Sequence, residues 1–130
     1  MGTWTTDDLD VIGSTEEVEL ASRRSDGALS EFVTMWVVRV GDDLYVRSAG
    51  GPTRPWYRRA LAADVGAIKA GGLRHCVAFG TADTGLHDAI DAAYHAKYDR
   101  YGPKIVRSVV GADAHDVTIR LVSTTEERSS

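Results

Sequence analysis

The chain has 130 residues, of which 43% are hydrophobic and 26% charged, and its net charge is −4. This length allows one domain, and the composition is that of a folded globular protein rather than a disordered one. No apolar run approaches the roughly 20 residues of a membrane span, and the single cysteine, Cys76, excludes an internal disulfide and a multi-cysteine metal site. With no secretory signal visible at the N-terminus, the expected location is cytoplasmic.

The charge is unevenly distributed along the chain. Residues 1–43 hold ten acids and three bases, residues 44–82 hold six bases and one acid, and residues 83–130 hold eight acids and six bases. The middle section therefore carries a net charge of +5 within an acidic protein. This section predicts a site for a small anionic molecule, whereas the negative total charge opposes nucleic-acid binding.

The N-terminal part of the chain predicts a helix, a strand and a turn. The helix begins in the segment Trp4–Leu9, where a threonine cap precedes acidic residues in the first turn, and Gly13 ends it. Apolar Val18 and Leu20 alternate with acidic neighbours, which is the period of a half-buried strand. The pair Asp26-Gly27 then indicates a turn.

The clearest prediction is a pair of strands joined by a hairpin. The first strand runs from about Phe32 to Val40 and is rich in β-branched and aromatic residues, and the second runs from about Leu44 to Ser48. Residues Gly41–Asp43 between them have the length of a hairpin turn. Because side chains alternate along a strand, Tyr45 and Arg47 share one face of the second strand.

A stretch rich in glycine and proline leads from this hairpin into a second helix. Gly50-Gly51-Pro52 breaks the sheet, and Pro55 suits the first turn of a helix over Trp56–Ala63. The turn Ala70–Gly72 then enters a strand over roughly Leu73–Phe79.

The strongest helix prediction covers Asp88–Tyr101. Its stripe has the spacing of a helix packed on a core and comprises Ile90, Ala93, Tyr94, Lys97, Tyr98 and Tyr101. Gly102-Pro103 stops this helix, and a last strand follows over Val117–Leu121. We therefore expect one α+β domain over residues 1–123, a small antiparallel barrel of about five to six strands with short edge helices. Residues 124–130 are expected to form a frayed polar tail.

The segment 47–59 is the most informative for function. A strand ends there, glycines allow close approach of the backbone, and a helix begins, so N–H groups, a hydroxyl and guanidinium groups can meet a phosphate. Trp56 and Tyr57 offer planar surfaces for a ring; alternatively, they anchor the core while the arginines are solvated. The residues predicted to bind a ligand or cofactor are Arg47, Ser48, Arg54, Trp56, Tyr57, Arg58 and Lys97.

Lys97 interrupts the apolar stripe of the Asp88–Tyr101 helix. Its amine either lies along neighbouring tyrosines and reaches water, or enters a pocket near Arg47 and supplies a positive charge there. The four histidines show no metal-ligand spacing, and Asp91 with His95 suits an i,i+4 surface pair, so no bound metal is expected. No residue stands out as a catalytic acid or base, and Tyr57 and Tyr94 come nearest to that role.

Four ungapped motifs carry a resemblance to a known family: Trp36–Ser48, Trp56–Arg58, Ile68–Gly72 and Ile90–Tyr98. Through them the chain resembles the bacterial domain-of-unknown-function family 2255 and, more distantly, the split β-barrel flavin and deazaflavin oxidoreductases. The resemblance implies a split barrel, a homodimer, and an FMN or deazaflavin cofactor whose phosphate is held by basic and hydroxyl residues at the barrel edge. The chain departs from this pattern in one respect: it lacks the upstream Gly-Arg-Lys/Thr-Ser-Gly phosphate motif of the deazaflavin nitroreductases and offers only Arg23–Gly27.

Two functional hypotheses follow. In the first, a split-barrel homodimer binds a small anionic ligand, a flavin or deazaflavin cofactor in a redox role, in a cleft around Arg47 and Arg58. In the second, a non-catalytic homodimeric domain without a cofactor uses the same arginines for ion pairs with the acidic N-terminal third across the dimer interface. Neither hypothesis has a nucleic acid or a membrane as partner.

Overall fold

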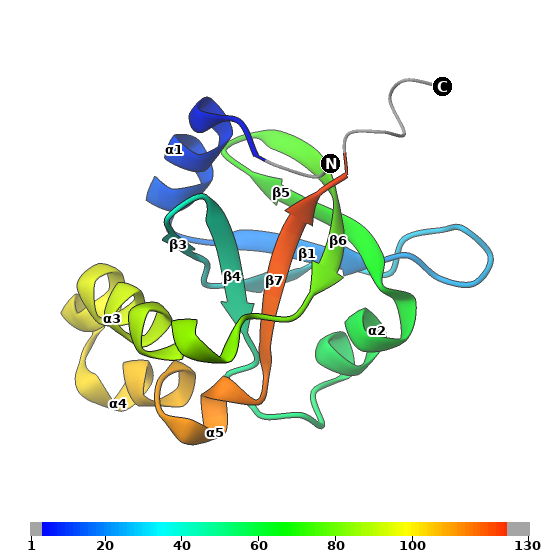
Figure 1. The fold of residues 1–130 in the computed structure, drawn as a ribbon. Helices are drawn as coiled ribbons and strands as arrows, with labels where there is room; N and C mark the ends of the chain where they lie inside the picture. Colours follow the sequence, from blue (N-terminus) through cyan, green and yellow to red (C-terminus); the bar gives the residue numbers. More distant parts are fainter. Residues whose placement is uncertain (1–3, 125–130) are drawn as a thin grey trace.

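Seven antiparallel strands form one sheet that curls into a half-barrel, with short helices packed around it, in the computed structural model, which describes residues 4–124 (Figure 1). The strands are β1 (Val18–Ser22), β2 (Val33–Met35), β3 (Val38–Val40), β4 (Asp43–Arg47), β5 (Val65–Ala70), β6 (Leu73–Gly80) and β7 (Thr118–Ser123). The helices are α1 (Thr6–Ser14), α2 (Pro55–Ala63), α3 (His87–Tyr98), α4 (Pro103–Val106) and α5 (Ala112–His115), with single 3₁₀ turns at Thr84–Leu86, Asp99–Tyr101 and Arg107–Val109. The predicted α+β barrel is thus confirmed, with more strands than the sequence indicated.

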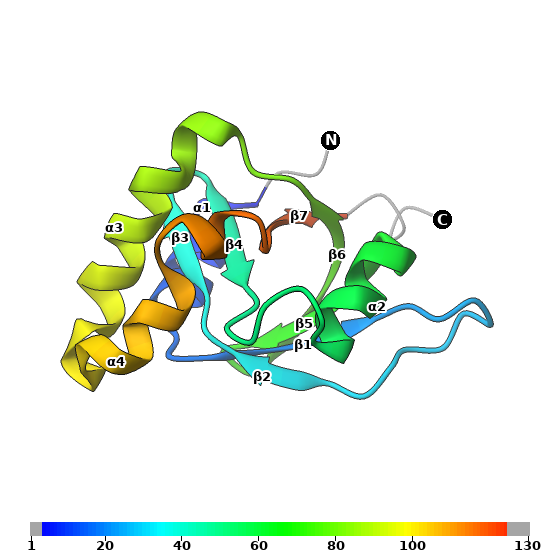
Figure 2. The same cartoon turned by 90° about the horizontal axis from the view of Figure 1, so that it is seen from below.

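The strand predicted over Phe32–Val40 is in fact two strands, β2 and β3. They lie at opposite edges of the sheet, and the short segment between them connects the two edges. β2 pairs with β1 and β3 pairs with β4, at opposite ends of the order β2-β1-β5-β6-β7-β4-β3. At Val37, α3 supplies the backbone partners: the N–H donates to the Tyr98 hydroxyl at 3.1 Å, and the carbonyl accepts from the Lys97 amine at 2.7 Å. The chain therefore leaves the strand ladder there and crosses from one edge to the other (Figure 2).

Strand β5, in the middle of the sheet, was not predicted. Its first residues include Gly66 and Ala67, which have low strand propensity. The glycine is nonetheless required, because a Cβ there would lie 2.0 Å from the Ala21 carbonyl oxygen and 2.8 Å from the Phe79 ring. The strand therefore forms because the β1 backbone and the Phe79 ring of β6 pack closely against Gly66, and not because its residues have a high intrinsic strand propensity.

Two apolar cores lie on the two faces of β4. Leu44 and Val46 point into the barrel interior, where they pack with residues of α1, α2 and the other strands. Tyr45 points the other way, into a second core beneath α3 that includes Tyr94 and Val109. The alternation predicted for this strand is therefore confirmed, and it turns Arg47 toward α3 as well.

The predicted helices form with small changes at their ends. Thr5 caps α1 by accepting a hydrogen bond from the Asp8 N–H at 3.0 Å, and α3 ends at Tyr98, before a 3₁₀ turn. Gly102-Pro103 ends the helical run as predicted, but Pro103 also begins α4. Among residues 4–124, no helix has the length and apolar character that crossing a membrane would demand. Residues 125–130, most of the predicted tail, lie outside the described residues.

Candidate functional site

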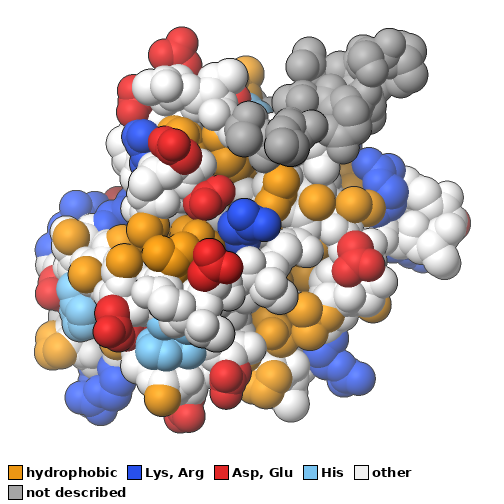
Figure 3. All heavy atoms as spheres, in the orientation of Figure 1, with side chains coloured by type: hydrophobic (Ala, Val, Ile, Leu, Met, Phe, Trp, Pro, Cys, Tyr) orange, Lys and Arg blue, Asp and Glu red, His pale blue; other side chains and the backbone are white. Residues whose placement is uncertain are grey.

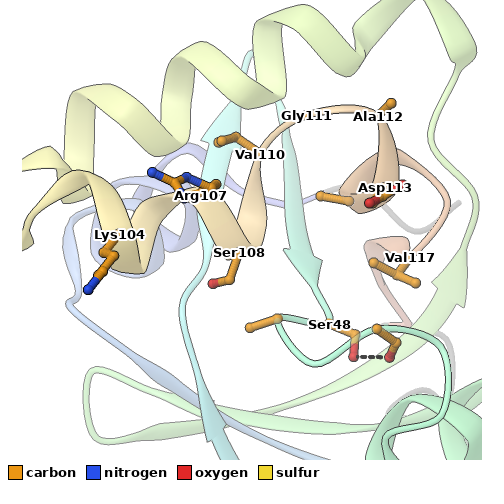
Figure 4. Close-up of a pocket in the computed structure, with 12 residues that line it drawn as sticks. Ser48, Lys104, Arg107, Ser108, Val110, Gly111, Ala112, Asp113 and Val117 are labelled. Atoms are coloured by element: carbon orange, nitrogen blue, oxygen red, sulfur yellow. Dashed lines mark hydrogen bonds between the residues drawn. The ribbon is translucent and has the colours of Figure 1, made fainter.

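A groove lies between the loop that follows β4 and the segment 104–114, which begins within α4. It consists of two adjoining cavities of about 620 and 370 Å³ that share Ala49 and Ser108 in their linings. Figure 4 shows the larger cavity, with Lys104, Arg107 and Ser108 on one side and Ser48 on the other. Both volumes fall in the range of about 300–1,000 Å³ typical of small-molecule sites. We call residues 104–114 the groove wall.

The two cavities differ in chemical character. The smaller one is lined by Trp36 and Trp56, by apolar residues of β2 and by Ile105, with Arg54 at its edge. The larger one is lined by Lys104 and Arg107, neither of which forms an ion pair with any described residue. The groove therefore has two tryptophans in its lining at one end and, at the other, cations without an ion pair among the described residues, although Glu17 and Asp113 also contribute to its lining.

Glycines shape the loop that forms the floor of the groove. The Ser48 hydroxyl donates to the Gly51 carbonyl at 2.6 Å, and Gly51 has a φ of +88°, which favours glycine. At Gly50 a Cβ would lie 1.6 Å from Arg54 Nε, so the missing side chain is what lets the guanidinium lie against the loop. The close neighbour at Gly50 is therefore Arg54 of the same chain.

Arg47 lies behind the groove wall in a network of polar contacts. Its side chain has 0% exposed surface, and its Nη1 group donates both to Asp91 Oδ1 and, at 2.8 Å, to the Val109 carbonyl. Its Nε group donates to the Thr118 hydroxyl at 2.8 Å. Burial alone would raise the pKa of Asp91, but hydrogen bonds from Arg47, His115 and the backbone outweigh burial and hold this pKa below its usual value.

Two histidines complete this network at the surface. The rings of His87 and His115 are stacked with centroids 4.4 Å apart and an interplanar angle of 8°. His115 Nε2 lies 3.1 Å from Asp91 Oδ2, and His87 Nδ1 lies 3.3 Å from Arg47 Nη2. In the face drawn in Figure 3, histidine side chains reach the surface where α3 and α5 lie. We call Arg47, Asp91, His87 and His115 the Arg47 cluster.

The structure brings four of the predicted binding residues to the groove. Arg47, Arg54 and Trp56 line the smaller cavity and Ser48 lines the larger one. The other three lie elsewhere. Tyr57 is buried in the core and donates to the Asp116 carbonyl, Arg58 is exposed on α2, and the amine of Lys97 is held by the carbonyl of Val37, away from both cavities.

The predicted pair of Asp91 and His95 is wrong. His95 instead pairs with Asp99, at 2.8 Å on the surface, while Asp91 faces Arg47 and His115. Both carboxylates are four residues from His95, one on either side, so spacing alone could not choose between them.

The residues that sequence reasoning missed lie mainly on the groove wall. Lys104 and Arg107 are spaced i, i+3 just after Pro103, and this spacing is the signal that could have placed both cations on one side of a helical turn. The sequence around Trp36 predicts only a continuous strand, because nothing local shows that the strand breaks beside it.

A third cavity, of about 560 Å³, is strongly basic. It lies between α2 and the loop after β1 and is lined by Arg23, Arg24 and Arg59 with two serines, and by no acid of the described residues. The Nε group of Arg59 is buried and has no hydrogen-bond partner among the described residues. Arg23, Arg24 and Ser25 of the segment Arg23–Gly27 contribute to this cavity.

No group of three or more histidine, cysteine, aspartate or glutamate side chains within residues 4–124 is arranged to hold a metal ion.

Comparison with known proteins identifies the family. Residues 8–121 match the bacterial family described as "Uncharacterized protein conserved in bacteria (DUF2255)". The chain belongs to this family. The resemblance found in the sequence motifs is thereby confirmed over most of the chain. No curated protein gives a significant match to the sequence.

Solved structures similar to this family member share its fold. One is titled "F420 Reductase", with 24% identity and a TM-score of 0.56, covering 90% of this chain and 93% of the other. A FAD-binding protein from Mesorhizobium loti has 17% identity and a TM-score of 0.57, covering 95% and 92%. A protein of unknown function from Agrobacterium tumefaciens has 11% identity and a TM-score of 0.62, covering 89% of this chain and 50% of the other. At these identities the similarity establishes the split-barrel fold.

Proposed function

We propose that the protein binds a small anionic molecule with a planar ring, a cofactor of the flavin or deazaflavin class, in the groove. The observation that carries this proposal is the juxtaposition of a cavity lined by Trp36 and Trp56 with one lined by Lys104 and Arg107. A planar ring favours the aromatic end and a phosphate favours the unpaired cations. Two proteins of the same fold, titled as an F420 reductase and a FAD-binding protein, support this class of ligand.

The residues present fit such a cofactor, and their roles in the proposal are distinct. Trp36, Trp56 and the apolar residues of β2 would exclude water from the ring, while Arg54, Lys104 and Arg107 would hold the anionic part. The bound group would supply redox chemistry, for which the chain itself would provide orientation and a dry surface. In this proposal Arg47 holds the Val109 carbonyl, and with it the groove wall, in place.

Binding of flavin mononucleotide and of the deazaflavin cofactor to the purified protein tests the proposal. The visible absorption spectrum reports cofactor that is retained on purification, and tryptophan fluorescence follows a titration. Trp36→Phe and Trp56→Phe should each remove part of the quenching. Trp4→Phe should change it less, because Trp4 lines neither cavity and its indole N–H is bonded to the Leu121 carbonyl. No binding of either cofactor at tens of micromolar would refute the proposal.

Matched arginine variants locate the anionic end. Arg107→Ala should weaken binding by about 10- to 150-fold, the equivalent of losing a hydrogen bond to a charged group worth about 1.5–3 kcal/mol. Arg58→Ala is the control, since this exposed side chain lines neither cavity. Equal losses in the two variants would contradict the assignment. A loss confined to Arg59→Ala would move the phosphate to the third, basic cavity.

The non-catalytic alternative makes a different prediction about the arginines. Its ion pairs would cross a dimer interface, but Arg47 pairs with Asp91 of the same chain and has no exposed side-chain surface. No comparable observation favours this alternative. The homodimer stays a prediction, which sedimentation equilibrium of the purified protein checks directly.

A further inference from the structure

The groove wall is tied to the barrel through the Arg47 cluster. The Val109 carbonyl accepts from Arg47 at 2.8 Å, and the Gly111 N–H donates to Asp91 Oδ2 at 3.3 Å. His115, next to the end of the wall, shares that same Asp91 oxygen. A change of charge inside the cluster therefore acts on the contacts that position one side of the groove.

His87 is the member of the cluster whose ring faces a fixed positive charge. A guanidinium group only donates hydrogen bonds, so the 3.3 Å contact between Arg47 Nη2 and His87 Nδ1 is a hydrogen bond only when Nδ1 carries no proton. The charged groups facing the ring are Arg47 from β4, Asp91 from α3, His115 from α5 and Asp116 just after α5. Burial lowers the pKa of His87, and the positive charges of His115 and Arg47 lower it further, against the opposing effect of the two carboxylates.

We propose that protonation of His87 releases the groove wall, so that the groove opens and loses its ligand in mildly acidic conditions. A proton on Nδ1 replaces a hydrogen bond from Arg47 with a contact between two cations. Arg47 cannot lose its charge, and its side chain is fully buried, so the parts nearer the surface must move. Those parts are the stacked rings of His87 and His115 and the groove wall, which directly precedes His115 in the chain. The loss of ligand rests on the proposed function, whereas the movement of the wall does not.

The direction of the pH effect follows from linkage. The pKa of His87 is lower in the folded state than in an open or unfolded one, so the open state binds more protons and gains on the closed state as pH falls below about 6.5. Each pKa unit of lowering corresponds to about a tenfold change in the opening equilibrium. Asp91, with its pKa below the usual value, titrates in a lower pH window, so the range from about pH 7.5 to 5 reports on histidine.

Hydrogen–deuterium exchange followed by mass spectrometry tests the movement of the wall in the intact protein without any ligand. After correction for the intrinsic pH dependence of exchange, peptides covering 104–114 should lose protection between about pH 7.5 and 5. Peptides from β5 and β6, in the middle of the sheet, serve as the internal reference. His87→Gln should abolish the loss, and His95→Gln, an exposed histidine of the same helix, should leave it intact.

Wild-type wall peptides that stay equally protected at both pH values would overturn the proposal, as would a His87→Gln variant with the same loss as the wild type. Nuclear magnetic resonance titration of the His87 ring provides a measurement that needs no variant: a pKa at or above the ordinary value for histidine would also overturn it. Flavin mononucleotide affinity at the two pH values extends the test to the ligand. If neither flavin mononucleotide nor the deazaflavin cofactor binds at either pH, the proposed function fails while the exchange result still decides whether the wall moves.

Discussion

Replacing Asp91 by asparagine should destabilise the protein more than replacing Arg47 by methionine, although both variants break the same ion pair. The two variants differ in the charged group that is left without its partner, which is the Arg47 guanidinium in one and the Asp91 carboxylate in the other. The Arg47 side chain has 0% exposed surface and the Asp91 side chain 21%, so only the carboxylate can be hydrated when its partner is gone. The carboxylate also keeps its hydrogen bonds from Gly111 and His115, whereas the guanidinium cannot neutralise.

The expected magnitudes follow from these environments. An uncompensated buried charge costs about 3–5 kcal/mol, which is the expected loss for Asp91→Asn. For Arg47→Met the main cost is the Val109 carbonyl left without its donor, about 1–3 kcal/mol. In a chain of 130 residues, the first loss lowers Tm by roughly 10–20 °C.

Urea unfolding at neutral pH, followed by circular dichroism, measures both free energies and their slopes with denaturant. The double variant should lose less than the two single variants added together, because its buried site no longer holds an unpaired charge. Asp99→Asn, in the exposed pair with His95, should change the free energy of unfolding by no more than about 0.5 kcal/mol. The reasoning fails if Arg47→Met is at least as destabilising as Asp91→Asn, or if both cost under about 1 kcal/mol.

Two further predictions concern the barrel and its junction with α3. Gly66→Ala should lower the free energy of unfolding by about 1–3 kcal/mol or more, because the added Cβ meets the Ala21 carbonyl. Gly85→Ala is the control in the same urea assay and should be near neutral, because no atom of the described residues lies within 4 Å of the added Cβ. Burial lowers the pKa of Lys97 to about 8, so above that pH the unfolded chain binds more protons than the folded one. The free energy of unfolding should therefore rise from pH 8 to about 9.5, below the range in which tyrosines titrate. Lys97→Met should remove this rise; an unchanged slope would show that the amine is hydrated in the folded state.

Periodicity predicted the parts of the fold that local chemistry determines. The cap of α1, the proline at the start of α2, the stripe of α3 and the alternation along β4 are each visible within a few residues of sequence. The break at Val37 was not visible, because the groups that replace its strand partners come from Lys97 and Tyr98, about 60 residues further along the chain.

The site was harder to predict, since its walls come from segments without a regular period. Residues 103–115 form two helices of four residues each and a 3₁₀ turn, too short for an apolar stripe to show. The face of Arg47 was predicted correctly from alternation. Its surroundings were not, because Asp91 and Val109 lie 44 and 62 residues away in sequence.

Charge counted by sequence section misplaces the cations that reach the groove. The basic middle section contributes only Arg54 as an exposed groove cation, since Arg47 is neutralised by Asp91 of the acidic C-terminal section. Lys104 and Arg107 belong to that same C-terminal section, and within residues 4–124 they form no ion pair, while two of its aspartates pair elsewhere. Burial and long-range pairing, rather than the net charge of a segment, thus decide where an anion is attracted.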